Sequence, residues 1–144
     1  MRLFLDANVL FSAAHNPQGN ARALFALAYT GLVDLESSAF ACDEAVRNIA
    51  VKFPKLRQSL ADLLEQVRRV REPPAPIVSR AMTLGLPNKD APILAAAVAA
   101  EVDALVTGDK RHFGPFFGQR VEGVLVLPLL EALALVLERR GSAD

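Results

Sequence analysis

Short apolar runs alternate with segments of helical hydrophobic spacing along most of this 144-residue chain. The runs are too short for helices, and the segments between them repeat apolar side chains every three to four residues. The expected strands are residues 3–5, 32–35, 104–107 and 121–127, with an edge strand at 68–71. Strands that alternate with helices form a mostly parallel sheet covered on both faces. The sequence therefore predicts an α/β protein.

The expected helices begin at capping residues or at proline. Asn20 can cap a helix that ends at Gly31, and Asn88 can cap a helix over residues 89–101. Two further helices are expected over residues 8–14 and 39–53. Another two are expected to begin at Pro54 and at Pro128. Because no repeat or linker interrupts this order, we expect a single domain over residues 1–144.

Composition narrows the class of protein. Hydrophobic residues make up 52% of the chain and charged residues 22%, which excludes disorder. Asp6 interrupts the apolar N-terminal run that a signal peptide would need, and no apolar stretch approaches the ~20 residues that span a bilayer. The single Cys42 allows neither an internal disulfide nor a thiolate zinc cluster. We therefore expect a soluble cytoplasmic protein.

The charges balance, with 16 basic and 16 acidic residues. The chain lacks the overall positive charge of proteins that hold nucleic acid by counterion release, which disfavours a pure DNA-binding module. A nuclease is less affected, because bound metals would supply positive charge at the phosphate.

Four carboxylates stand where this order of elements brings them to one edge of the sheet. Asp6 and Asp109 directly follow expected strands, Asp90 lies in the first turn of a helix, and Glu44 lies off the apolar face of another. Ligands of such sheets bind at this carboxyl edge. At roughly 4 Å and an effective dielectric near 20, two carboxylates repel by about 4 kcal/mol. A cluster of four needs protons or cations, and Mg²⁺ or Mn²⁺ suits its oxygen ligands.

Each acid also has a structural explanation. Asp6 could cap a helix, Asp90 could interact favourably with a helix dipole, and Asp109 could be a turn residue. Glu44 could form an ion pair on a solvated face. Asp43 stands next to Glu44, and the helix register leaves open which of the two faces the site.

Three segments of the sequence resemble PIN-domain nucleases. They are LFLDANVLFSA at residues 3–13, DEAVRNI at 43–49 and KDAPILAAAVAAEVDALVTGDKRHF at 89–113. The branch that they resemble most is the VapC-like toxin ribonucleases and related stand-alone PIN proteins. The resemblance covers nearly the whole chain. It implies a three-layer α/β/α sandwich with a central mostly parallel sheet, dependence on Mg²⁺ or Mn²⁺, and hydrolysis of RNA.

The resemblance also implies roles for individual residues. The positions that match the family's catalytic and metal-binding acids are Asp6, Glu44, Asp90 and Asp109. Asn8 and Thr107 match the polar positions beside them. An amide at Asn8 could orient Asp6 or a metal-bound water, and the Thr107 hydroxyl could hold a carboxylate. Thr107 is equally suited to end a strand as a β-branched residue.

Three further residues directly follow Asp109. Lys110, Arg111 and His112 are candidates for binding substrate phosphates, although such a basic turn is also typical of solvated surface. His112 could instead act as a general acid or base, or pack beside Phe113. In the implied mechanism, the acids hold one or two metals. One metal lowers the pKa of a bound water, and the resulting hydroxide attacks the phosphorus in line, while a second metal would stabilise the departing oxygen.

The helix after Pro128 carries leucines on more than one face, which indicates burial or a homodimer contact. The resemblance implies both a homodimer and a protein antitoxin. A haloacid dehalogenase-type phosphatase needs a second acid where Asn8 stands, and the order of acids fits a receiver domain poorly. The alternative that stays open is a non-catalytic PIN-like module that binds RNA or a protein partner.

Overall fold

The computed structural model describes residues 1–143. Within this range, six strands form one sheet in the order β3-β2-β1-β4-β6-β5. The strands are β1 (Arg2–Leu5), β2 (Asp34–Ser37), β3 (Val67–Arg69), β4 (Ala104–Val106), β5 (Arg120–Val121) and β6 (Val124–Leu127). All neighbouring pairs are parallel except β5 and β6. The predicted mostly parallel sheet is confirmed.

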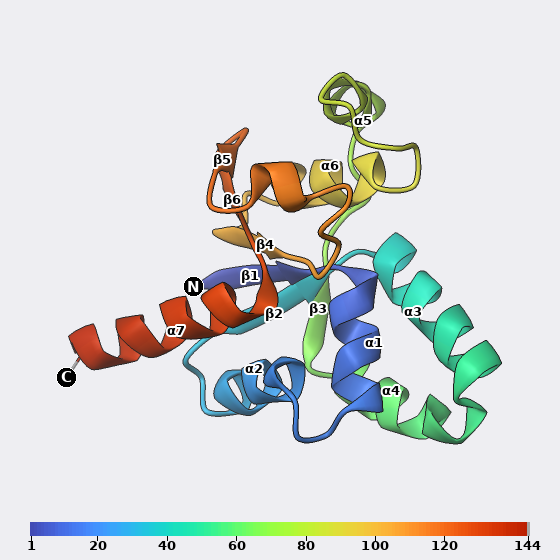
Figure 1. The fold of residues 1–144 in the computed structure, drawn as a ribbon, viewed down its shortest axis with the longest axis vertical. Coiled ribbons are helices and arrows are strands. Elements are labelled where there is room, and N and C mark those ends of the chain that lie inside the picture. The colour runs from blue at the N-terminus through green and yellow to red at the C-terminus, as the bar shows by residue number, and fades with distance from the viewer. Residues whose placement is uncertain (144) are drawn as a thin grey trace.

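Helices cover both faces of the sheet (Figure 1). On one side lie α1 (Ala7–His15), α2 (Asn20–Tyr29), α3 (Ala39–Lys52) and α4 (Arg57–Leu64), with α7 (Leu129–Ala143) packed against α2. On the other side lie α6 (Ala91–Ala99) and α5 (Ala75–Met82), which pack against each other. Short 3₁₀ turns occur at Pro54–Leu56 and Gly114–Phe116. The predicted three-layer α/β/α sandwich is confirmed.

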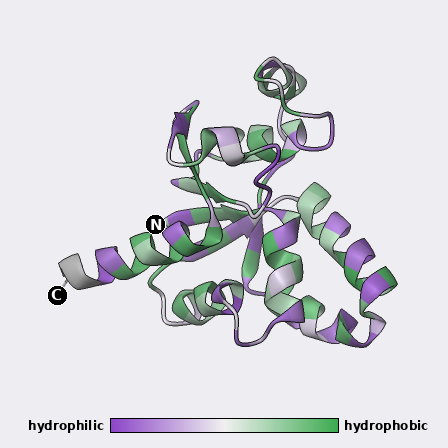
Figure 2. Ribbon diagram, viewed as in Figure 1, coloured by the Kyte–Doolittle hydropathy of each residue, from purple (hydrophilic) through white to green (hydrophobic). Residues whose placement is uncertain are grey.

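The central strands β1 and β4 are buried on both faces, and this explains why their sequences are continuously apolar. Leu3, Phe4 and Leu5 are completely buried, as is all of β4. Figure 2 shows hydrophobic residues along β4 and β6, whereas α3 has hydrophilic and hydrophobic stretches in turn. In the part of the chain that the structure describes, no helix combines the length and apolar character needed to cross a membrane.

Several predicted elements differ from the structure in their bounds. The strand expected over residues 32–35 is β2, which covers Asp34–Ser37, and the edge strand expected over 68–71 is β3, which covers Val67–Arg69. The run expected as one strand over residues 121–127 is a hairpin of β5 and β6, joined at Glu122 and Gly123. Both residues have positive φ, 52° and 89°, as a type I′ turn requires. The helix expected from residue 89 begins at Ala91, because residues 88–90 form a turn.

Helix α5 is not among the predicted helices. It follows Pro74, and Pro76 lies in its first turn, where proline is tolerated because those amides have no intrahelical acceptor. The two prolines favour an extended or turn conformation in a local interpretation of the sequence. Packing against α6 supplies the missing stabilisation.

Candidate metal centre

Asp6 lies directly after β1 at the N-cap of α1 and is 4% exposed. Its Oδ1 accepts a hydrogen bond from the Ala7 N–H at 2.7 Å. Its Oδ2 accepts hydrogen bonds from the Thr107 hydroxyl at 2.8 Å and from the Asn8 amide at 3.3 Å. Asp6 is therefore a helix cap, as one interpretation of the sequence proposed, and is also held rigidly at the carboxyl edge of the sheet.

Thr107 and Asn8 connect the ends of β1 and β4. The Thr107 oxygen accepts a hydrogen bond from the Asp109 N–H at 3.1 Å, and Asn8 Oδ1 accepts one from the Gly108 N–H at 2.7 Å. A Cβ at Gly108 would lie 3.3 Å from Asn8 Oδ1, so a larger residue there would crowd this contact. Both polar residues implied by the resemblance thus lie beside the acids that they were expected to orient.

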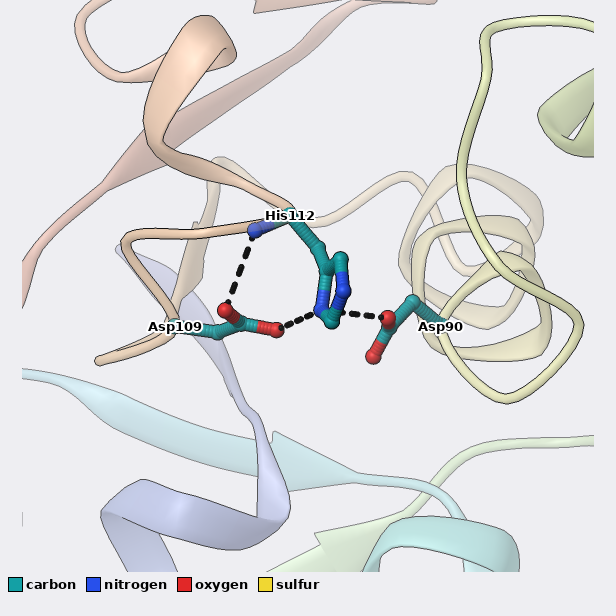
Figure 3. A group of neighbouring side chains, drawn as sticks. All are labelled: Asp90, Asp109 and His112. Atoms are coloured by element: carbon teal, nitrogen blue, oxygen red, sulfur yellow. Dashed lines mark hydrogen bonds and ion pairs between the residues drawn. The ribbon is translucent and has the colours of Figure 1, made fainter.

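Asp90, Asp109 and His112 form a tight group at the same edge (Figure 3). The His112 Nδ1 lies 2.8 Å from Asp109 Oδ2 and 3.1 Å from Asp90 Oδ2, so one ring nitrogen contacts both carboxylates. The His112 N–H donates a hydrogen bond to Asp109 Oδ1 at 3.1 Å. One potential ligand atom from each residue lies within 4.8 Å of the others. This spacing suits a single bound cation.

Asp90 has an unsatisfied oxygen. Its Oδ2 is buried, and among the described residues it has no partner with hydrogen-bond geometry, although His112 Nδ1 lies at ion-pair distance. A buried polar atom without a partner destabilises a protein by about 1–3 kcal/mol. Such an atom is expected where a ligand completes its coordination.

The pKa values of these acids reflect their crowding. Burial, together with the charges of Glu44 and Asp90, raises the pKa of Asp6 to about 6, despite the opposing hydrogen bonds from Thr107 and Ala7. Burial and the charge of Asp109 also raise the pKa of Asp90, against the opposing charges of Lys89 and His112. Near neutral pH, the cluster therefore ionises at a free-energy cost that a cation would offset.

Asp109 behaves in the opposite way. Partial burial by itself would raise the pKa of Asp109, but hydrogen bonds and the charge from His112 outweigh this effect and hold the pKa below its ordinary value. Asp109 is therefore the most readily ionised acid of the group formed with Asp90 and His112.

The structure favours Glu44 over Asp43 at the site. Glu44 is half-buried and close enough to Asp6 for its charge to raise the pKa of that acid. Asp43 is exposed, and its charge acts on the thiol of Cys42 instead. The helix register that the sequence left open therefore turns Glu44 toward Asp6.

The basic residues near the acids separate into two groups. Lys110 and Arg111 are exposed, as substrate-binding or simply solvated residues would be. His112 is half-buried between two acids, a more central position than the sequence indicated. Its spacing of three residues from Asp109 is the signal that could have placed it there, since such residues meet within one turn. Lys89, whose charge lowers the pKa of Asp90, was not singled out from the sequence.

The residues present fit a divalent cation. Carboxylate oxygens with one imidazole nitrogen suit Mn²⁺, and the carboxylates alone suit Mg²⁺. The unsatisfied Asp90 Oδ2 and the raised pKa values of Asp6 and Asp90 show that a positive charge would be stabilised here. Asp90, Asp109 and His112 could hold the ion directly, with Asp6 and Glu44 beside them.

Removing the Thr107 hydroxyl is expected to raise the pKa of Asp6 further. In a Thr107→Val variant, the carboxylate loses a 2.8 Å hydrogen bond that favours its charged form. NMR titration that follows the side-chain carboxyl carbon of Asp6 in the metal-free protein would measure the shift in pKa. Thr30→Val, at an exposed threonine on the end of α2, is the matched control. An unchanged titration of Asp6 in Thr107→Val would contradict the assigned contact.

Fold and site together define an α/β/α protein with a carboxylate-rich candidate metal centre at the carboxyl edge of its sheet. The family model of the PIN domain matches residues 2–111, and the chain belongs to the PIN domain family. PIN domains are nucleases, which agrees with the resemblance found in the sequence.

Several solved structures share the fold of this chain. PAE2754 from Pyrobaculum aerophilum has a TM-score of 0.69 and 17% identity, over 96% of this chain and 96% of that chain. VapBC2 from Rickettsia felis, solved bound to a DNA fragment from their promoter, has a TM-score of 0.62 and 18% identity, over 89% and 98%. FitAcB from Neisseria gonorrhoeae has a TM-score of 0.59 and 22% identity, over 89% and 98%. At these identities the likeness concerns the fold. No protein of curated function is significantly similar in sequence.

Proposed function

We propose that this chain is a metal-dependent endoribonuclease that hydrolyses phosphodiester bonds of RNA. The observation that carries the proposal is the buried acidic cluster, in which Asp90 Oδ2 has no hydrogen-bond partner among the described residues. The proposed metal ligands and catalytic residues are Asp6, Glu44, Asp90 and Asp109. One PIN-like domain over residues 1–144 would carry this activity in the cytoplasm.

The chemistry divides between the ion and the chain. A bound Mg²⁺ or Mn²⁺ would supply Lewis acidity toward the scissile phosphate and toward a water. Thr107 and Asn8 hold Asp6 in one orientation through hydrogen bonds to its Oδ2. Lys110 and Arg111, exposed beside Asp109, would bind phosphates of the substrate strand.

His112 has two possible states in this proposal. Without a metal, the His112 ring contacts both Asp90 and Asp109 through Nδ1. With a metal, a neutral ring could donate Nδ1 to the ion or turn away from the acids, where it could exchange a proton with the substrate.

We further propose that the protein is the toxin of a toxin–antitoxin pair. The resemblance to VapC-like toxins and the fold shared with VapBC2 and FitAcB support a protein antitoxin as partner. A homodimer is supported by α7, which buries Ala132 and Val136 but leaves Leu130 and Leu137 exposed by 63% and 46%. Such exposed leucines on one helix suit contact with another chain.

A non-catalytic PIN-like module that binds RNA or a protein is the second candidate. The contact of His112 with both Asp90 and Asp109 favours it, because an imidazole that bridges two acids can hold them together without any metal. In that case the acids would serve the structure alone.

Cleavage of a generic single-stranded RNA separates the two candidates. We expect the protein to cut this RNA in the presence of Mg²⁺ or Mn²⁺. Cleavage should stop when EDTA is added and resume when metal is supplied in excess. Native-state stability should also rise by about 2.7 kcal/mol at a metal concentration 100 times the dissociation constant. If the protein shows no cleavage and no stabilisation by metal, the nuclease proposal fails and the non-catalytic module is the candidate that stands.

A further inference from the structure

A groove of about 620 Å³ lies between the edge of the sheet and the helices α5 and α6. Its floor is the face of β2 and β3 that bears Glu36 and Arg68, and its wall includes Ile77 of α5 and Ala100 at the end of α6. Arg71, which follows β3, also lines it. We call this feature the arginine groove. It is distinct from the acidic cluster, since it shares no lining residue with it.

The charge of the arginine groove is positive, although the whole chain is neutral. Four arginines line it against two glutamates. One of these glutamates, Glu36, is already neutralised, because Arg2 binds both of its oxygens, with one contact at 2.8 Å. Arg68 and Arg71 are exposed and have no ion-pair partner within residues 1–143. The groove therefore offers unneutralised guanidinium groups, whose planar donors suit phosphate.

The sheet register places the Arg71 end of the arginine groove at the edge of the sheet that bears the acidic cluster. Phe4 is level with Glu36, and Glu36 is level with Arg68, so β3 ends at the same edge as β1. Pairing continues past β3, since the Val70 N–H donates to the Ser37 carbonyl at 2.8 Å. Arg71 therefore lies at the carboxyl edge, two strands from Asp6, which corresponds to roughly 10 Å between the strand backbones.

We propose that the arginine groove binds the phosphate backbone of a single-stranded polynucleotide on one side of the bond to be cut. This inference rests on the proposed nuclease function and adds the form of its substrate. A strand whose scissile phosphate lies at the acids has neighbouring phosphates within reach of Arg71 and then Arg68. The groove has about the volume of a small-molecule pocket, which suits one strand of a polynucleotide.

Binding of a fluorescein-labelled single-stranded RNA of about 12 nucleotides tests the proposal. In EDTA, which prevents cleavage, anisotropy would give the dissociation constant between about 50 and 200 mM salt. We expect Arg68→Gln with Arg71→Gln to weaken binding at least tenfold at the lower salt. The slope of log affinity against log salt should fall by about 1.4, since each phosphate contact on a single strand contributes about 0.7.

Arg120→Gln with Arg139→Gln is the matched control, because it removes the same charge from β5, at the other edge of the sheet, and from α7. All four arginines are exposed, so both double variants should fold normally, as circular dichroism would verify. The control should change binding less than twofold. Equal weakening in both double variants, or no weakening in the first, would overturn the proposal.

Two further measurements separate RNA binding by the groove from binding of an acidic protein and from the nuclease proposal itself. The first measures binding of a labelled deca-glutamate peptide to the parent and to the variant that lacks Arg68 and Arg71. If the variant binds this peptide more weakly than the parent but binds RNA equally well, the groove binds an acidic protein segment and the proposal is overturned. If the parent binds RNA through these arginines but never cuts it with Mn²⁺, the groove stands and the nuclease proposal fails. If the double variant binds and cuts RNA as the parent does, the nuclease proposal stands and the proposed role of the groove fails.

Discussion

Replacing Asp90 by asparagine is expected to reduce RNA cleavage at least about 100-fold while leaving the fold intact. The change removes a charge from the group that would hold the ion, where even indirect partners contribute 10–100-fold. It breaks few structural contacts, because Asp90 makes no capping hydrogen bond to α6 and its Oδ2 has no hydrogen-bond partner among the described residues. Initial rates with Mn²⁺ on single-stranded RNA measure the effect.

Asp103→Asn is the control for this prediction. Asp103 belongs to the same sequence segment but lies at the opposite edge of the sheet, where it accepts a hydrogen bond from the Arg2 N–H at 2.7 Å. Its variant should cut RNA at the parent rate. Equal cutting by Asp90→Asn and the parent would indicate another site or a contaminating nuclease. Toxicity on expression that disappears only with Asp90→Asn would favour the toxin hypothesis.

Replacing Asp6 by asparagine is expected to stabilise the metal-free protein above pH 6. Burial raises the pKa of Asp6 from 3.8 to about 6, so the folded state binds this proton more tightly than the unfolded state does. The free energy of unfolding therefore falls as pH rises from about 4 to 6, by about 3 kcal/mol in total from this group. Asparagine has no charge to bury, and the Thr107 hydroxyl can accept a hydrogen bond from its amide.

Urea unfolding in EDTA between pH 4 and pH 8 would measure this gain. The variant and the parent should have similar stability near pH 4 and diverge as pH rises, with the full difference above pH 6. Added Mg²⁺ should stabilise the parent and narrow the difference. Asp103→Asn should follow the parent at every pH. A constant offset between Asp6→Asn and the parent would mean that ionisation of Asp6 does not govern their difference.

Much of the fold follows from local sequence. The continuous apolar run before Asp6 and the run before Thr107 predict buried strands, because β1 and β4 are covered on both faces. The strand ends then place Asp6 and Asp109 at one edge without further information. The hairpin at Glu122 was missed because a non-glycine residue there adopts a positive φ that composition alone does not indicate.

The details of the site follow less directly from the sequence. Glu44 and Asp43 are equivalent in composition, and only the packing of α3 turns one of them toward Asp6. His112 contacts Asp90 across 22 positions of sequence, a contact that no local spacing encodes. The sequence predicts only an edge strand at Arg68 and Arg71. The groove beside this strand is formed by α5 and α6, whose placement there the local sequence does not indicate.

The sequence by itself determined the α/β class, the buried strands before Asp6 and Asp109, the acids that follow them and the similarity to one family. Each of these depends on periodicity and on neighbours within a few residues. The tertiary structure alone decided the strand order, the hydrogen bond between Thr107 and Asp6 across 101 positions, and the place of the arginine groove. The physical reason is that strand pairing and helix packing are set by burial of apolar faces across the whole chain, which no single segment specifies.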